Sequence, residues 1–433
     1  MNPLVGALVL ILLGLLGARL SFAEARVPLG PRLIISSGTH FLFLGFLLGS
    51  HALALFPRDV IDQLYPFLAL GLGWIGFLFG LQLDRRHLRW FPRRYLAIAL
   101  LQAALTFLLF LGFGLLALGT EIGLEHRVGL LTAAATACIS TPAAIALISR
   151  TFRMKGRVSR LLYFIASLDA IVGILALQLT YAFHRGPVLA SAFDATVGLE
   201  WISIAALLGV IFGVLFLWLT RPRPSGEEIV LFLLGLVVFA SGTALHLGLS
   251  PLFVSAVAGA VVANLSPLRR RIYALLQTWE QPVYVILLIL AGALLDFPSW
   301  LVVPLALGYL LVRALAKIIA GYAATRVIRP AFTAPADLGA GLIPQGGISL
   351  AMAVSVVLTY GAMELDGLVL PDVVFSTVVL GVVASELVGP ILTRGLLRRT
   401  GEIHPRVEPE GADRDVSSEP SGHTHAASIR RGP

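Results

Sequence analysis

Three charged residues lie deep inside apolar stretches of this 433-residue chain: Asp169, Lys317 and Arg313. At about 1.5 Å per helical residue, Asp169 lies roughly 15 Å into the apolar run 161–183, and Lys317 lies at a similar depth in the run 301–325. Arg313 precedes Lys317 by one helical turn, on the same face. Charges at such depth in a bilayer survive mainly where they act on an ion or a proton. Asp169 with a basic partner is therefore the first candidate site.

A buried carboxylate beside an ammonium can hold a proton, a metal cation or the ammonium itself, but not all three. Competition for one carboxylate is what the exchange of a cation for a proton requires. Lys317 is the favoured partner of Asp169, because a buried lysine can lose its proton whereas arginine effectively cannot. The alternative is a fixed strut in which Asp169 pairs permanently with Lys317 or Arg313 and joins two helices.

Ser140, Thr141 and Pro142 interrupt the apolar run 128–149. Proline removes a backbone hydrogen bond and so frees carbonyl oxygens in a helix. With Asp169, the two hydroxyl groups and these carbonyls would form an oxygen shell for a transported monovalent cation. The alternative for each hydroxyl is a hydrogen bond to the preceding helical turn.

A second interruption, Pro344-Gln345-Gly346-Gly347, lies in the apolar run 337–358. Two breaks at matching positions in the two halves of a membrane chain indicate a transporter site. The alternative is a pair of ordinary helix kinks.

The composition explains how such residues are positioned, because 58% of the residues are hydrophobic and 13% are charged. A bilayer, rather than one soluble core, accommodates this much apolar surface. Long alternating apolar and polar segments, typical of membrane β-barrels, are missing from the sequence. We predict an all-α polytopic membrane protein with about thirteen spans, near 4–22, 33–55, 66–83, 95–118, 128–149, 161–183, 199–219, 229–246, 250–265, 282–297, 301–325, 337–358 and 371–393.

Loop charge supports this division. Most of the Lys and Arg residues between spans fall in alternate loops, whereas the other loops hold Arg58, Arg127 and Arg185. The positive-inside rule then places the N-terminus outside and the C-terminus in the cytoplasm, most simply at the cell membrane. Residues 1–398 form the transmembrane domain in this interpretation, with 4–22 as a retained first helix. Residues 399–433 form a disordered cytoplasmic tail, because they lack the apolar residues of a core.

Spans one to six and eight to thirteen form two sets of opposite orientation, with span seven as a linker. The fifth member of each set carries the break, so two inverted repeats should cross at their discontinuous helices. Spans four to six and eleven to thirteen would hold the site, and the other spans would form a scaffold.

Several motifs together resemble the monovalent cation:proton antiporter superfamily, especially its second branch, over roughly residues 35–395. The motifs are Phe77-Leu78-Phe79-Gly80-Leu81-Gln82-Leu83-Asp84 followed by Leu88, Ser140-Thr141-Pro142-Ala143-Ala144, Ser167-Leu168-Asp169, Leu290-Ala291-Gly292-Ala293-Leu294-Leu295-Asp296, Lys317, and Pro344-Gln345-Gly346-Gly347-Ile348-Ser349.

The resemblance implies that Asp169 binds the ion, that Lys317 is its basic partner, and that the scaffold forms a homodimer. It also implies alternating access. Two positions depart from the family pattern. Leu168 stands where members usually carry Asp, Asn or Gln, and Gln345 stands where many carry Arg.

We therefore expect a secondary active transporter that exchanges a monovalent cation, Na⁺ or K⁺, for H⁺, with no cofactor. With Leu168 in place of a polar neighbour, Asp169 is the one carboxylate placed at mid-membrane in the core, which favours one-for-one exchange; Glu386 is placed nearer the cytoplasmic end of its span. The alternative is that Lys317 also releases and rebinds a proton, which would make the exchange electrogenic. A channel, a carrier without proton coupling, and a transport-impaired scaffold on the same fold remain alternatives. Neither an enzyme nor a nucleic-acid-binding protein is expected, because no nucleophile–base–carboxylate set appears and the basic residues follow the loops.

The topology is testable by single-cysteine labelling on a Cys138→Ser background. With Lys155→Cys, a membrane-impermeant thiol reagent should label only after the cytoplasmic side is opened, whereas Arg185→Cys should label in intact cells. Strong external labelling at position 155 would contradict the thirteen-span arrangement.

Overall fold

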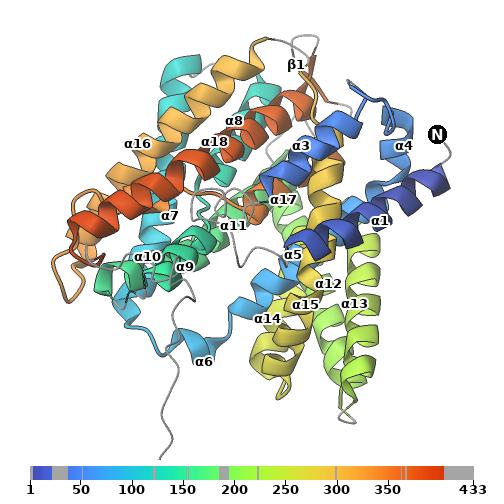
Figure 1. The fold of residues 1–433 in the computed structure, drawn as a ribbon, viewed down its shortest axis with the longest axis horizontal. Coiled ribbons are helices and arrows are strands. Elements are labelled where there is room, and N and C mark those ends of the chain that lie inside the picture. Colours follow the sequence, from blue (N-terminus) through green and yellow to red (C-terminus); the bar gives the residue numbers. More distant parts are fainter. Residues whose placement is uncertain are drawn as a thin grey trace, which may run out of the picture.

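The computed structural model describes residues 3–21, 38–50, 52–119, 123–152, 154, 156–184, 195–221, 224–297, 300–361, 363–365 and 368–403. Most of the described chain is helical; its strand pairings are a two-residue antiparallel pairing of β1 (Glu364–Leu365) with β2 (Leu368–Val369) and an isolated bridge between Gly49 and Phe56 (Figure 1). Most of the predicted tail, residues 404–433, lies outside the described residues, as do the predicted loop positions Arg26, Arg32, Arg153, Lys155, Arg185 and Arg223.

Helices occupy each stretch predicted to span the membrane. Among the described residues, nine helical segments are long and apolar enough to cross a bilayer, and four shorter apolar helices occupy other predicted positions. The helices are α1 (Pro3–Ser21), α3 (Thr39–Leu48), α4 (Arg58–Gln63), α5 (Tyr65–Gln82), α6 (Arg85–Leu88), α7 (Arg93–Leu118), α8 (Leu124–Ala137), α9 (Pro142–Thr151), α10 (Arg157–Leu168), α11 (Ala170–Phe183), α12 (Ala195–Leu219), α13 (Gly226–His246), α14 (Pro251–Leu265), α15 (Arg269–Ala293), α16 (Val302–Ile328), η3 (Leu338–Leu342), α17 (Gly347–Tyr360) and α18 (Leu370–Arg399). The exact count of thirteen spans stays a prediction.

The helices form two groups (Figure 1). One group, the scaffold, consists of α1, α3, α5 and α12 to α15. The other group, the core, consists of α7 to α11, α16, η3, α17 and α18. The core contains the helices that carry both predicted breaks and all three deep charges.

Small residues allow the scaffold helices α5 and α14 to pack backbone to backbone. A Cβ atom at Gly76 or Gly80 would collide with carbonyl oxygens of α14, and one at Gly259 would collide with a carbonyl oxygen of α5. Such close approach is how membrane helices gain packing energy when lipid offers no hydrophobic driving force between them. The short turn to α14 from α13 uses Gly248 in the left-handed region, at φ 64°.

The helix α15 begins at Arg269, well before the predicted start near residue 282. Its first half is amphipathic: Ile272 and Leu276 are buried, whereas Gln277 and Glu280 face a cavity. A search for continuous apolar runs misses such a segment, because its polar face points into the protein rather than into lipid.

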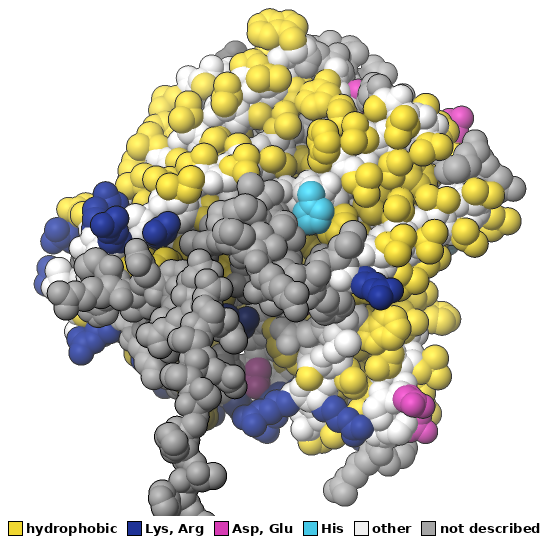
Figure 2. All heavy atoms as spheres, viewed as in Figure 1, with side chains coloured by type: hydrophobic (Ala, Val, Ile, Leu, Met, Phe, Trp, Pro, Cys, Tyr) yellow, Lys and Arg dark blue, Asp and Glu magenta, His cyan; other side chains and the backbone are white. Residues whose placement is uncertain are grey.

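The loops gather at two ends of the molecule, as the alternation of loop charge requires. At one end, called the basic end, Arg94 donates to the carbonyl of Arg329 at 3.4 Å and Arg269 pairs with Asp84 at 2.7 Å. At the opposite end, Arg58 contacts Asp372. Figure 2 shows Lys and Arg side chains along the left and lower edge of one face and hydrophobic side chains over its upper part.

Candidate functional site

The first break separates α8 from α9 and leaves residues 138–141 outside regular helix. Thr141 is the N-cap of α9, where its hydroxyl accepts a hydrogen bond from the Ala143 amide at 3.3 Å. Pro142 follows at the first helical position, where its missing N–H costs nothing. The sequence Thr-Pro therefore restarts a helix here rather than merely bending one.

The second break separates η3 from α17 and lies directly against the first. The Thr141 amide donates to the Pro344 carbonyl at 2.9 Å, and the Ser140 hydroxyl donates to the Leu342 carbonyl at 2.9 Å. Backbone groups freed by one break are thus satisfied by the other, which is how non-helical backbone is tolerated at membrane depth. The two discontinuous helices cross as predicted.

The Lys317 ammonium is held by three oxygen atoms at this crossing. It donates to Asp169 Oδ2 at 3.0 Å, to Ser140 Oγ at 2.8 Å, and to the Cys138 carbonyl oxygen. The other carboxylate oxygen, Asp169 Oδ1, accepts from the Ser140 amide at 3.2 Å. Both charged side chains are 0% exposed. Three donors meet three acceptors, so the ammonium is fully coordinated by protein oxygens.

Close packing of α16 against η3 sets the position of Lys317. Gly339 lies so near the Lys317 carbonyl that a Cβ atom there would collide with it. Gly321, one turn after Lys317, also meets Gly339. These two glycines let the helix that carries the lysine approach the second break.

Arg313 forms hydrogen bonds to the backbone of the two helix breaks rather than to the Asp169 carboxylate. Its guanidinium is fully buried and donates to the Ile343 carbonyl at 2.6 Å and to the Ile139 carbonyl at 2.7 Å. These carbonyls belong to different broken helices. Arg313 therefore links the two breaks through its fork of donors, a geometry that lysine does not provide.

Gln345 has a comparable structural role. Its Nε2 donates to the Thr136 carbonyl at 3.0 Å and to the Tyr309 hydroxyl at 2.9 Å. Its Oε1 accepts from the Ser385 hydroxyl at 3.4 Å. The side-chain amide of Gln345 therefore links α8, α16 and α18 around the second break. Sequence reasoning identified Gln345 but missed Thr136, Tyr309 and Ser385, which carry no charge and belong to other helices.

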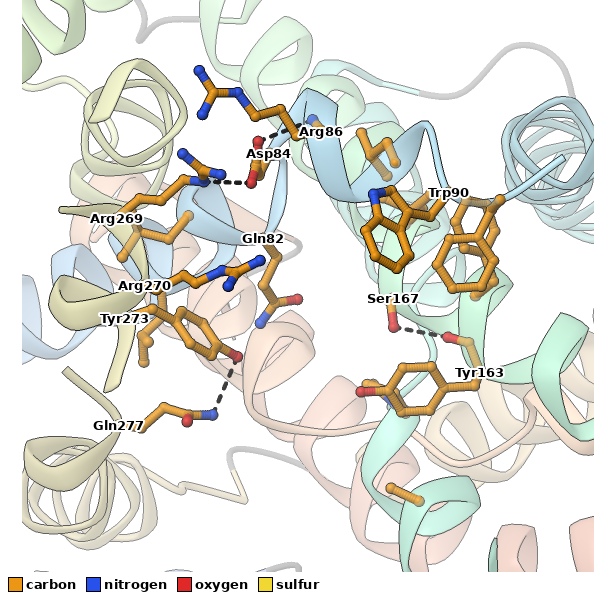
Figure 3. Close-up of a pocket in the computed structure, with 18 of the residues that line it drawn as sticks. Gln82, Asp84, Arg86, Trp90, Tyr163, Ser167, Arg269, Arg270, Tyr273 and Gln277 are labelled. Atoms are coloured by element: carbon orange, nitrogen blue, oxygen red, sulfur yellow. Dashed lines mark hydrogen bonds and ion pairs between the residues drawn. The ribbon is translucent and has the colours of Figure 1, made fainter. Parts of the chain in front are cut away.

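A cavity of about 750 Å³ separates the core from the scaffold and reaches the residues beside the site. On the core side it is lined by Pro142, Ser167 and Leu168. On the scaffold side it is lined by residues of α15, which face Ser167 and Tyr163 across the opening (Figure 3). Arg86 and Arg269 also line it, so the cavity opens at the basic end.

The structure brings together Asp169, Ser140 and Lys317, whereas Thr141 turns its hydroxyl to its own helix. Gly346 lies against Thr141, and Gly347 lies against Tyr284 of the scaffold. Within the described ranges, no three His, Cys, Asp or Glu side chains converge on a metal site. The oxygens around Lys317 therefore combine one carboxylate with neutral groups.

A membrane-spanning bundle with two crossed discontinuous helices and a buried carboxylate at the crossing defines a secondary transporter of the inverted-repeat class. The family model "Sodium/hydrogen exchanger, transmembrane" matches residues 10–399. The chain belongs to this family, which consists of transporters rather than enzymes, and it is an integral membrane protein.

Solved structures of similar fold support the architecture. Two structures of the sodium proton antiporter MjNhaP1 from Methanocaldococcus jannaschii are similar to this chain, with TM-scores of 0.66 and 0.63 and 16% sequence identity in each case. The first match covers 92% of this chain and 99% of that chain, and the second covers 94% and 100%. No sequence among the curated proteins matches this chain.

The separate roles of Lys317 and Arg313 lead to a stability prediction. Lys317→Ala leaves Asp169 buried without its cation, a loss of roughly 3–5 kcal/mol that protonation of the carboxylate relieves. Arg313→Ala leaves carbonyls unpaired at about 1–3 kcal/mol each, whatever the pH. We expect the melting temperature of purified Lys317→Ala to recover towards that of the unsubstituted protein between pH 8 and pH 5, and that of Arg313→Ala to stay low.

Transport in proteoliposomes gives an independent control on the choice of Lys317 rather than Arg313 as the partner of Asp169. Lys317→Ala should change the pH profile of transport. If it leaves transport and the pH profile unchanged while Arg313→Ala abolishes both, Arg313 is the functional partner of Asp169.

Proposed function

We propose that this protein exchanges a monovalent cation, Na⁺ or K⁺, for protons by alternating access, with Asp169 as the group for which they compete. The observation that carries the proposal is the coordination of Lys317 by Asp169, Ser140 and the Cys138 carbonyl. These oxygens already surround one monovalent cation, the lysine ammonium. Carbonyl, hydroxyl and carboxylate oxygens can likewise replace the hydration shell of an alkali cation.

An arriving cation must displace the ammonium, because Lys317 uses the same oxygens. A proton on Asp169 would instead remove the negative charge that holds either cation. Asp169 therefore takes one partner at a time, and exchange follows when the loaded site opens to alternate sides. The basic end is the cytoplasmic end by the positive-inside rule, which also puts the C-terminus in the cytoplasm.

The opposite end is closed by ion pairs between the groups of helices. Arg58, on α4 beside the scaffold, donates to both carboxylate oxygens of Asp372 on α18, at 2.9 and 2.7 Å. It also lies 3.5 Å from Asp296, which follows α15. Partial burial opposes the charge of Arg58, yet the hydrogen bond and charge of Asp372 hold the pKa of Arg58 above its ordinary value. A cavity at one end and a closure at the other support alternating access with the cytoplasmic side open here.

The two departures from the family pattern are compatible with this proposal. Gln345 provides neutral donors at the second break, and Arg313 supplies the positive charge there. Leu168 supplies no oxygen beside Asp169, so the first break offers a single carboxylate. A homodimer formed by the scaffold remains the expectation from the resemblance, and the cell membrane remains the proposed location.

Exchange is tested with purified protein in proteoliposomes that enclose a pH-sensitive dye. An imposed Na⁺ or K⁺ gradient should drive opposite proton movement with the unsubstituted protein, and Asp169→Asn should reduce it to the rate of empty vesicles. Asp337→Asn, a half-exposed aspartate that pairs with Arg399 and does not contact Asp169 or Lys317, is the matched control. Proton movement that persists in Asp169→Asn would refute the proposal, and cation flux without proton movement would favour a carrier or channel.

The closure at Arg58 is tested by accessibility. Ser376 is buried and donates to the Asp296 carbonyl at 2.5 Å, so Ser376→Cys on the Cys138→Ser background reports opening of that end. Arg58→Gln should raise its labelling rate by an external thiol reagent several-fold. Arg58→Lys should give an intermediate rate, because Arg58 contacts Asp372 and Asp296 through two different nitrogens whereas lysine has one. Equal labelling rates with and without the Arg58→Gln substitution would show that these ion pairs do not close the outer side.

A further inference from the structure

Glu386 lies at the level of the second break, in the middle of α18. The neighbouring Ser385 hydroxyl donates to Gln345 Oε1 at 3.4 Å, and Gly389, one turn further, lies against Pro344. The sequence suggested a position nearer the cytoplasmic end, because the last apolar run was expected to end at residue 393. The helix instead continues to Arg399, so Glu386 lies near its middle rather than near its end.

The carboxylate of Glu386 is poorly compensated. Its Oε1 atom is buried and has no hydrogen-bond partner among the described residues. Arg313 of α16 lies within electrostatic reach, but its terminal nitrogens donate to the Ile343 and Ile139 carbonyls. An ionised carboxylate with a buried, unpaired oxygen is costly, and a proton removes that cost.

The scaffold side of Glu386 leads back to the cavity. Tyr284 of α15 packs against Gly347, the first residue of α17, and its hydroxyl lies within electrostatic reach of both Glu386 and Glu280. Glu280, one turn before Tyr284, lines the cavity at the basic end. Tyr284 therefore lies within electrostatic reach of one carboxylate that lines the cavity, Glu280, and of one at the second break, Glu386, across the boundary between scaffold and core.

We propose that Glu386 is a second proton-binding site, which exchanges protons with the cytoplasmic cavity by way of Glu280 and Tyr284 and moves with Asp169. This proposal rests on the proposed exchange function. A cation that displaces the Lys317 ammonium from ionised Asp169, with Lys317 keeping its proton, adds one positive charge to the core and favours release of the Glu386 proton. On the return step both carboxylates carry protons. Two protons then exchange for one cation, and one net charge crosses the membrane in each cycle.

This stoichiometry differs from the one-for-one exchange that the sequence favoured. The difference arises because the structure adds a carboxylate at the second break to the one at the first. Asp169 and Glu386 occupy the two halves of the repeat, and Arg313 lies within electrostatic reach of both.

The test is the voltage dependence of exchange in proteoliposomes with the membrane potential set independently. A potential of 100 mV should shift the cation gradient at which flux stops by about 50-fold for one net charge per cycle. We expect this shift with the unsubstituted protein, and continued exchange without the shift in Glu386→Gln. Glu280→Gln should keep the shift but exchange more slowly.

The controls separate this proposal from the function on which it rests. Glu227→Gln, an exposed glutamate at the start of α13, and Glu386→Asp, which keeps the carboxylate, should both retain the shift. No exchange by the unsubstituted protein would refute the proposed function itself. The second site is refuted if that protein exchanges without a shift, if Glu386→Gln retains the shift, or if folded Glu386→Gln is inactive. A shift lost in Lys317→Gln but kept in Glu386→Gln would make the lysine the second carrier.

Discussion

The contact on which the structure depends is the one between the Lys317 ammonium and the oxygens of Asp169, Ser140 and Cys138. A buried ion pair is weak as a source of stability, because desolvation offsets the attraction between the charges. It is well suited to competition, because a proton or a cation can replace one partner. The surrounding structure satisfies the remaining polar groups with neutral donors and acceptors, so that Lys317 remains the cation beside Asp169.

The crossed breaks provide that support. Each discontinuous helix exposes backbone groups that lipid could not satisfy. Direct backbone contact between Thr141 and Pro344, the fork of Arg313 and the amide of Gln345 satisfy many of them. The polar groups of the site therefore hold one another in place, and Asp169, the proposed ion-binding residue, lies between the helices α10 and α11 of the core rather than in a long loop.

The proposed exchange depends on how this core meets the scaffold. The cavity at the basic end and the contacts of Arg58 at the other end both lie where the two groups of helices face each other. The amphipathic first half of α15 lines the cavity with Gln277 and Glu280. These polar side chains face the cavity rather than lipid or the tightly packed core, as the lining of an aqueous access route must.

The sequence by itself determined the apolar stretches that became helices, the sorting of loop charge between two ends, the two breaks and Asp169 with a basic residue of the run 301–325 as the candidate site. These follow from local properties: hydropathy, proline and glycine chemistry, and the high cost of deep charge. The tertiary structure decided that Lys317 rather than Arg313 contacts Asp169, that Thr141 caps its own helix, and that Glu386 lies beside the second break. Such contacts join residues far apart in the chain, and their geometry depends on how closely helices pack, as Gly339 against Lys317 shows.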